Sequence, residues 1–105
     1  MNPEWKDRWV KALRGGKYKQ GRGSLRVKDT FCCLGVLCDI SGMGEWDNYK
    51  FICETTSHTC FIPVKVLEAV DLLNKDRSGV QGTLSRMNDG GSSFSEIADY
   101  IEENL

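Results

Sequence analysis

The chain has 105 residues, 40% of them hydrophobic and 28% charged, which is the length and composition of one ordinary globular domain. Its longest apolar run, residues 31–38, is well short of the roughly 20 residues of a membrane span, and the charged N-terminal residues lack the apolar stretch of a secretory signal. The net charge is −1, but the charges are unevenly distributed along the chain. Residues 1–28 carry nine Lys or Arg and two acidic side chains, whereas residues 29–105 carry five Lys or Arg and thirteen acidic side chains. We therefore expect no membrane association, and either a face that attracts anions or a solvated basic surface.

The N-terminal residues predict a helix that ends at a pair of glycines. Asn2 is a suitable N-cap, Pro3 suits the first helical position, and Glu4 places negative charge in the first turn. The glycine pair opens a loop over residues 15–24, which holds four glycines. Before this loop, apolar residues recur at helical spacing: Trp5, Trp9, Ala12 and Leu13.

The following segment predicts two short strands and a buried helix. Leu25–Lys28 alternates apolar and polar residues, as a strand with one buried face does, and a turn at its end leads into a second strand at Thr30–Cys32. Cys33–Ile40 is apolar nearly all round, so we expect a helix at the centre of the fold. Gly35 within this helix would let a neighbouring backbone approach closely.

The second half of the chain predicts a hairpin and further helices. After a loop at Trp46–Asn48, the β-rich segments Tyr49–Cys53 and Thr59–Ile62 flank a polar turn. Pro63 is expected to open a helix that runs to Leu73. The remaining elements are a polar loop at Asn74–Gly82, a helical turn at Thr83–Asn88, and a last helix from a capping box at Ser93–Glu96 to Leu105.

These elements predict an α+β fold. We expect a small single domain over residues 1–105 with a buried central helix, short antiparallel strands or a hairpin, and amphipathic helices at both ends.

The five cysteines are odd in number and include the adjacent pair Cys32-Cys33, so they predict reduced thiols in the cytoplasm rather than a disulfide framework. Cys32 precedes a helix N-terminus, where a thiolate is stabilised, but no sequence signature joins it to His58, the only histidine, as a nucleophile pair. Cys53, His58 and Cys60 lack the paired C-x-x-C spacing of zinc sites, and a metal site there stays an open alternative. We expect structural thiols, no catalytic residues and no cofactor.

The loop from Gly15 to Gly23 is the most informative stretch for function. Its glycines allow backbone N–H groups to approach an anion, and three of its side chains are basic. It lacks the G-x-x-x-x-G-K-[ST] sequence of nucleotide hydrolases, and a flexible surface loop with solubilising charge is the alternative. Asn88–Ser93 precedes a helix N-terminus, and we expect it to form a tight turn and an N-cap rather than an anion site.

Three segments of the chain, near both ends and in the middle, resemble a widespread family of small phage and prophage proteins. The most distinctive is the run Phe-Cys-Cys-Leu-Gly-Val-Leu-Cys-Asp at residues 31–39. The resemblance implies a phage accessory protein and carries over no catalytic residue. The other two segments match at Trp9, Ala12, Leu13, Arg14, Gly16, Tyr18 and Gln20, and at Met87, Asn88, Asp89, Gly91, Ser93, Phe94, Ile97, Ala98, Asp99, Ile101 and Glu102.

Small phage accessory proteins are often counter-defence factors, and this analogy gives the leading hypothesis. It is a non-enzymatic protein in the host-cell cytoplasm that binds and sequesters a phosphate-bearing nucleotide immune signal. The residues expected to hold phosphates are Lys17, Lys19, Arg22 and Arg26, and those expected to stack on a base are Trp5, Trp9, Tyr18 or Trp46.

Two other functions stay open. One is a protein-binding inhibitor of a host defence or regulatory protein, which would use the acidic C-terminal half. The other is a nucleic-acid-binding protein, against which the acidic half and the lack of a nucleic-acid-binding motif both argue. The sequence leaves the oligomeric state, including a homo-oligomer, undecided.

Overall fold

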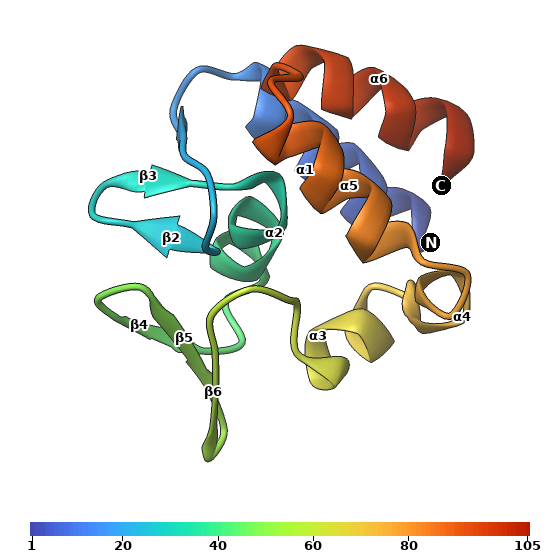
Figure 1. Ribbon diagram of the computed structural model, residues 1–105. Coiled ribbons are helices and arrows are strands. Elements are labelled where there is room, and N and C mark those ends of the chain that lie inside the picture. Colours follow the sequence, from blue (N-terminus) through green and yellow to red (C-terminus); the bar gives the residue numbers. More distant parts are fainter.

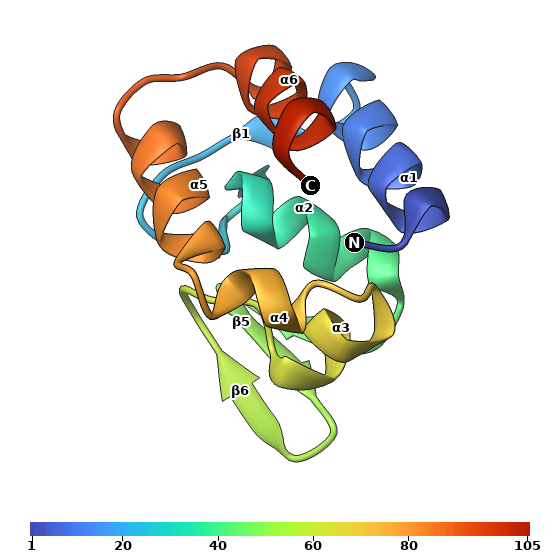
Figure 2. The ribbon, with the colours of Figure 1, turned by 90° about the vertical axis from the view of Figure 1, so that its right-hand side faces the viewer.

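The computed structural model describes residues 1–105, and helix α2 (Cys33–Ser41) runs through its middle (Figures 1 and 2). The Sγ atom of Cys32 accepts a hydrogen bond from the N–H of Gly35 and so caps the start of the helix. Gly42 ends it in the left-handed conformation, with φ of 66°. All six residues from Cys33 to Cys38 are buried, which confirms the predicted central helix.

Two longer helices pack against α2, namely α1 (Pro3–Arg14) and α5 (Val80–Asp89), and a third, α6 (Phe94–Asn104), packs against both of them. The Asn2 side chain caps α1, and Ser93 and Glu96 form the predicted capping box at the start of α6. Helices α1 and α6 lie side by side although they stand at opposite ends of the chain (Figures 1 and 2). Measured by length and apolar character, none of the helices is able to span a membrane.

Two small sheets cover the other side of α2 (Figure 1). The first has the order β1-β3-β2, with β1 parallel and β2 antiparallel to the central strand, and the second is the antiparallel meander β4-β5-β6. The architecture confirms the predicted α+β class. The strand bounds are β1 (Lys19–Gln20), β2 (Arg26–Val27), β3 (Thr30–Phe31), β4 (Glu45–Asp47), β5 (Lys50–Cys53) and β6 (Thr56–His58).

The sheets differ from the prediction in three places. Strand β1 lies within residues 15–24, which were expected to form a loop, because Lys19 pairs with Thr30 on β3. The expected loop at Trp46–Asn48 is largely strand β4, because Trp46 pairs with Phe51 on β5. The hairpin partner of β5 is β6 and not Thr59–Ile62, because the chain turns earlier, at Glu54, whose φ is 57°. The Thr59 carbonyl instead accepts the N–H of Leu25 and so links the two sheets.

The expected helix from Pro63 to Leu73 begins as predicted, with Pro63 as its N-cap, but its predicted end is wrong. Helix α3 (Val64–Ala69) ends early, because Asp71 adopts a left-handed conformation and the N–H of Leu72 bonds back to the Leu67 carbonyl. This reversal turns Leu72 into the core, where it is fully buried. The segment predicted as a polar loop and a short helical turn forms α4 (Leu73–Asp76) and the longer α5.

Candidate functional site

The glycine-rich loop after α1 is held against the C-terminal end of α5 and the loop that follows it. The Gln20 side-chain amide donates to Asn88 Oδ1 at 2.9 Å and to the Ser92 carbonyl at 2.8 Å. The Gly21 N–H bonds the Phe31 carbonyl at 2.7 Å, and the Gly23 N–H bonds an Asp89 carboxylate oxygen at 3.2 Å. These two N–H groups are occupied within the protein, so neither is available to an anion.

Asn88 is the residue that joins this loop to the core, and it is fully buried. Its Oδ1 accepts the N–H of Cys33 at 3.2 Å as well as the amide of Gln20, and its Nδ2 donates to the Gly21 carbonyl at 2.8 Å. No local sequence pattern indicates this role, since an Asn before Asp89 and a glycine pair is typical of a turn. Asn88 therefore fixes the course of the loop relative to α2.

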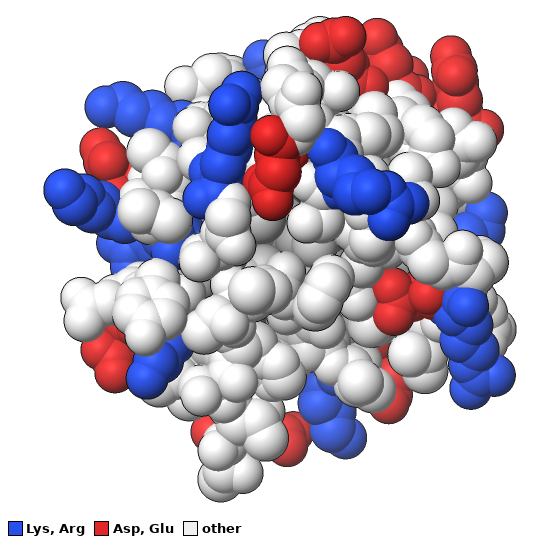
Figure 3. Space-filling view, in the orientation of Figure 1, with Lys and Arg blue, Asp and Glu red and all other residues white.

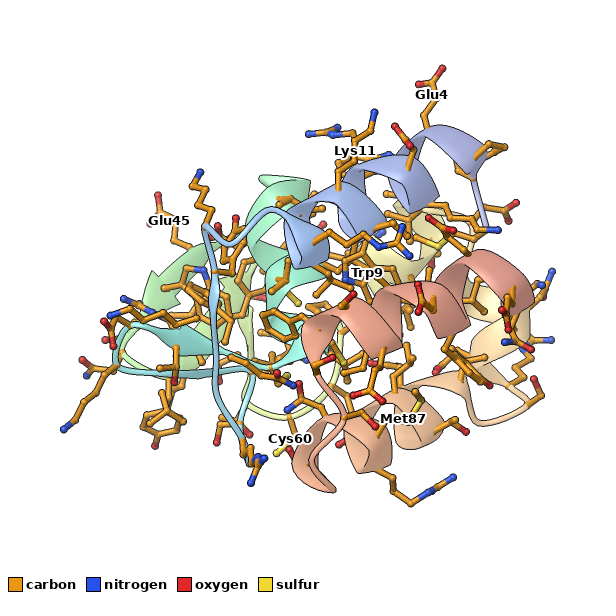
Figure 4. The ribbon with its side chains drawn as sticks, turned by 90° about the horizontal axis from the view of Figure 1, so that it is seen from above. Glu4, Trp9, Lys11, Glu45, Cys60 and Met87 are labelled. Carbon is orange, nitrogen blue, oxygen red and sulfur yellow. The ribbon has the colours of Figure 1, made fainter.

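The basic side chains nearest the start of the loop line a shallow open groove of about 380 Å³, here called the α1 groove. Its floor is apolar, formed by Ala12, Ile40 and the ring of Tyr18, and its rim carries three cations. The residues that line it are Arg8, Lys11, Ala12, Gly15, Lys17, Tyr18 and Ile40. Figure 4 shows Lys11 pointing away from the body of α1, whereas Trp9 points into the core.

Sequence reasoning found Lys17 and Tyr18 but missed Arg8 and Lys11. The groove residues of α1 and its C-cap occupy positions 8, 11, 12 and 15, which is the spacing of a single helix face. This pattern was available in the sequence and would have placed two cations beside the apolar Ala12. Lys11 also forms an exposed ion pair of 2.8 Å with Asp7, one turn earlier on α1.

Tyr18 also belongs to a row of aromatic rings behind the groove. Its ring meets Phe31 edge-on at 5.1 Å between centroids, Phe31 meets Trp46 at 5.6 Å, and Trp46 meets Phe51 at 5.0 Å. Asp39 on α2 accepts hydrogen bonds from the Tyr18 hydroxyl at 2.5 Å and from the Trp46 indole N–H at 3.0 Å. Burial, and then the bond to Asp39, raise the pKa of Tyr18 well above its usual value, so the hydroxyl stays protonated and donates to Asp39.

The tryptophans predicted to stack on a base lie in different surroundings. Trp9 is fully buried and donates its indole N–H to the Cys33 carbonyl at 3.0 Å, so it has no ring face open to a ligand. Trp5 is half-buried beside the α1 groove, with the guanidinium of Arg8 4.1 Å from its ring centroid. Trp46 lies in the aromatic row and does not line the α1 groove.

The other predicted phosphate ligands lie outside the α1 groove. Lys19 is exposed and pairs with Asp29 at 3.4 Å. Arg22 is exposed near Gly91. Arg26 lines a second groove between two hairpins, together with Asn48. The predicted cations therefore do not converge on one point.

Four of the five cysteines are buried, and only Cys60 is exposed. Burial is the main cause that raises the pKa of the Cys32 and Cys33 thiols, which disfavours their nucleophilic thiolate forms. His58 bonds the Thr56 hydroxyl at 2.8 Å through Nε2. No three His, Cys, Asp or Glu side chains are placed to hold a metal ion.

We expect a single fast-reacting thiol. In native protein an aromatic disulfide reagent should modify Cys60 quickly and the buried cysteines only after denaturation, when all five react, because buried thiols are both shielded and poorly ionised. The measurement is absorbance of the released thiolate with and without denaturant. The Cys60→Ser variant should lose the fast phase. A second fast thiol in native protein would contradict the burial described here.

Comparison with known proteins identifies one match. A family model described as a domain of unknown function (DUF8296) matches residues 1–105. No curated protein and no solved structure is similar to the chain.

Proposed function

The chain belongs to the family DUF8296, a domain of unknown function, and from its own side chains we propose that it binds a phosphate-bearing, nucleotide-type small molecule in the α1 groove. In this proposal it is a non-enzymatic phage accessory protein that sequesters an immune signal in the host-cell cytoplasm. The observation that carries the proposal is the placement of Arg8, Lys11 and Lys17 around an apolar floor.

The two parts of the groove suit the two parts of such a ligand. Cations bind phosphate oxygens through charge-assisted hydrogen bonds, and the groove is lined by Arg8 from α1 and Lys17 from the loop. The apolar floor suits a base or sugar face, with Tyr18 as one wall. Lys19, Arg22 and the hairpin residues remain candidates for a ligand that extends beyond the groove.

The test is calorimetric titration with ADP, ADP-ribose and a cyclic dinucleotide. We expect binding by the native protein and a loss of roughly tenfold or more in affinity for Lys17→Glu and for Arg8→Glu, since a hydrogen bond to a charged group contributes about 1.5–3 kcal/mol. The matched control is Lys65→Glu, an exposed lysine on α3 outside the groove, which should bind as the native protein does.

Four results would count against the proposal. Absence of heat with every ligand contradicts phosphate binding, and equal heats for Lys17→Glu and Lys65→Glu contradict the α1 groove as the site. A loss confined to Arg22→Glu would move the ligand to the far end of the glycine-rich loop. Conversion of the ligand during incubation would contradict a non-enzymatic role.

A second candidate function is a protein-binding inhibitor. It is favoured by two large apolar side chains that stand out from the surface close together in the chain, Phe61 and Val64, which are 52% and 54% exposed. Co-purification of one host protein with the native chain and not with the Phe61→Ser variant would support this function over ligand sequestration.

A further inference from the structure

The β2–β3 and β4–β5 hairpins point to the same side of the molecule (Figure 1), and a groove of about 410 Å³ lies between their tips. We call it the hairpin groove. Lys28 and Asn48 stand at the two tips, both in left-handed conformations with φ of 56° and 54°. The groove is lined by Arg26, Val27, Lys28, Asp29, Asn48 and Tyr49, none of which lines the α1 groove.

Arg26 is held in place by aromatic rings and has no acidic partner. Its guanidinium carbon lies 5.8 Å from the ring centroid of Phe31 and 5.7 Å from that of Trp46. One terminal nitrogen donates to the Asn48 carbonyl at 3.2 Å. Its Nε is buried without any hydrogen-bond partner. The ion pairs of the chain engage Lys11, Arg14 and Lys19, so the charge of Arg26 is not neutralised within the protein.

The surroundings of Arg26 are basic and partly apolar. Lys28 lies in the same groove, Lys50 lies over the Tyr49 ring at 5.7 Å, and the one acid of the groove, Asp29, already pairs with Lys19. Figure 3 shows Lys and Arg side chains gathered on this side of the molecule, over β2 and β3, while Asp and Glu gather over α6. Val27 and Tyr49 expose apolar surface beside these charges, 41% and 47% of each side chain.

We propose that the hairpin groove binds an acidic segment of a protein partner, with a carboxylate of that segment on the terminal nitrogens of the Arg26 guanidinium, away from the buried Nε. A guanidinium without an acidic partner matches a carboxylate geometrically. Because the aromatic rings already order the Arg26 side chain, binding a carboxylate costs it little further conformational entropy. Arginine and tyrosine are also enriched among the hot-spot residues that contribute most of the binding free energy in protein interfaces. A small anion alone would leave Val27 and Tyr49 uncovered, which favours a peptide.

The proposal is independent of phosphate binding in the α1 groove, and its test uses random peptides. The native protein is used to select binders from a displayed library of random short peptides. We expect enriched peptides to carry Asp or Glu next to an apolar residue, and their binding to weaken as salt is added. Enrichment of peptides without acids, or no enrichment at all, would overturn the proposal.

The selected peptides are then measured by fluorescence anisotropy against matched variants. Arg26→Gln should bind at least about tenfold more weakly, and Arg26→Lys should recover only part of the loss, because it restores the charge without the planar pair of donors. Arg77→Gln, which removes an exposed arginine on the end of α4, is the control and should bind normally.

A second variant covers the case in which Arg26→Gln fails to fold. Lys28→Asn removes one charge of the groove at a position where asparagine suits the left-handed backbone, and we expect it to weaken binding severalfold. Unchanged peptide affinity in Lys28→Asn, or in a folded Arg26→Gln, overturns the proposal. Binding of ADP that is lost in Arg26→Gln and retained in Lys17→Glu would make the hairpin groove the phosphate site and would likewise overturn the peptide assignment.

Discussion

Replacement of Gly35 by alanine should lower the free energy of unfolding by about 3 kcal/mol or more, with a fall in Tm of roughly 10 °C or more. A Cβ atom at Gly35 would lie 1.9 Å from the Leu25 carbonyl oxygen and 2.8 Å from its carbon, both backbone atoms. Leu25 has little room to yield, because its N–H bonds Thr59 at 2.7 Å and its carbonyl accepts the N–H of Cys32 at 3.1 Å. The close approach anticipated from the sequence therefore joins α2 to the strand segment beside it.

The matched control is Gly82→Ala, in the middle of α5. A Cβ at this position meets only the end of the Arg86 side chain, at 3.4 Å. Because alanine is a better helix former than glycine, the variant should be as stable as the native protein or more stable by up to about 1 kcal/mol. Thermal and denaturant unfolding of both variants measure the difference, and a Gly35→Ala protein as stable as Gly82→Ala would disprove the contact.

Replacement of Asn88 by alanine should cost about 2–4 kcal/mol of unfolding free energy. The change orphans the buried N–H of Cys33 and the carbonyl of Gly21, and each unsatisfied buried group costs about 1–3 kcal/mol. It also releases the Gln20 amide from its Asn88 contact. We therefore expect faster hydrogen exchange at the glycine-rich loop, at Gly21 and Gly23, in addition to the loss of global stability.

Asn74→Ala provides the comparison, because Asn74 is exposed on α4 and should change stability by no more than about 0.5 kcal/mol. Denaturant unfolding gives the free energies, and hydrogen exchange read by mass spectrometry gives the local effect. If Asn88→Ala and Asn74→Ala have the same free energy of unfolding, the hydrogen bonds of the buried Asn88 amide do not stabilise the fold.

The parts of the fold that depend on local chemistry were predictable from the sequence. The caps at Asn2 and Ser93 and the all-round apolar run of α2 each have a local cause that acts within a few residues. The break after α3 was not predictable in this way. Apolar spacing continues past Asp71, and only the burial of Leu72 in its tertiary setting makes the left-handed turn favourable.

The candidate site was predicted only in part, for a related reason. The basic residues of the glycine-rich loop are close in sequence, but an extended chain spreads neighbouring side chains apart, so Lys17 and Arg22 do not share a groove. The cations that accompany Lys17 come from α1, where helical spacing puts Arg8 and Lys11 on one face. Contacts set by tertiary hydrogen bonds, such as those of Asn88, leave no local pattern in the sequence.

The pairing of α1 with α6 has a consequence for how the chain folds while it is being synthesised. Lys6 on α1 bonds the Glu102 carbonyl at 2.8 Å, and Arg14 forms ion pairs with Asp99 and Glu102. Residues 15–93 separate α1 from α6, and at about 5–20 residues per second their translation takes about 4–16 s, during which α1 is without its partner. During that interval the apolar face around Trp9 lacks the cover that α6 supplies, so the nascent chain stays accessible to chaperones until α6 emerges.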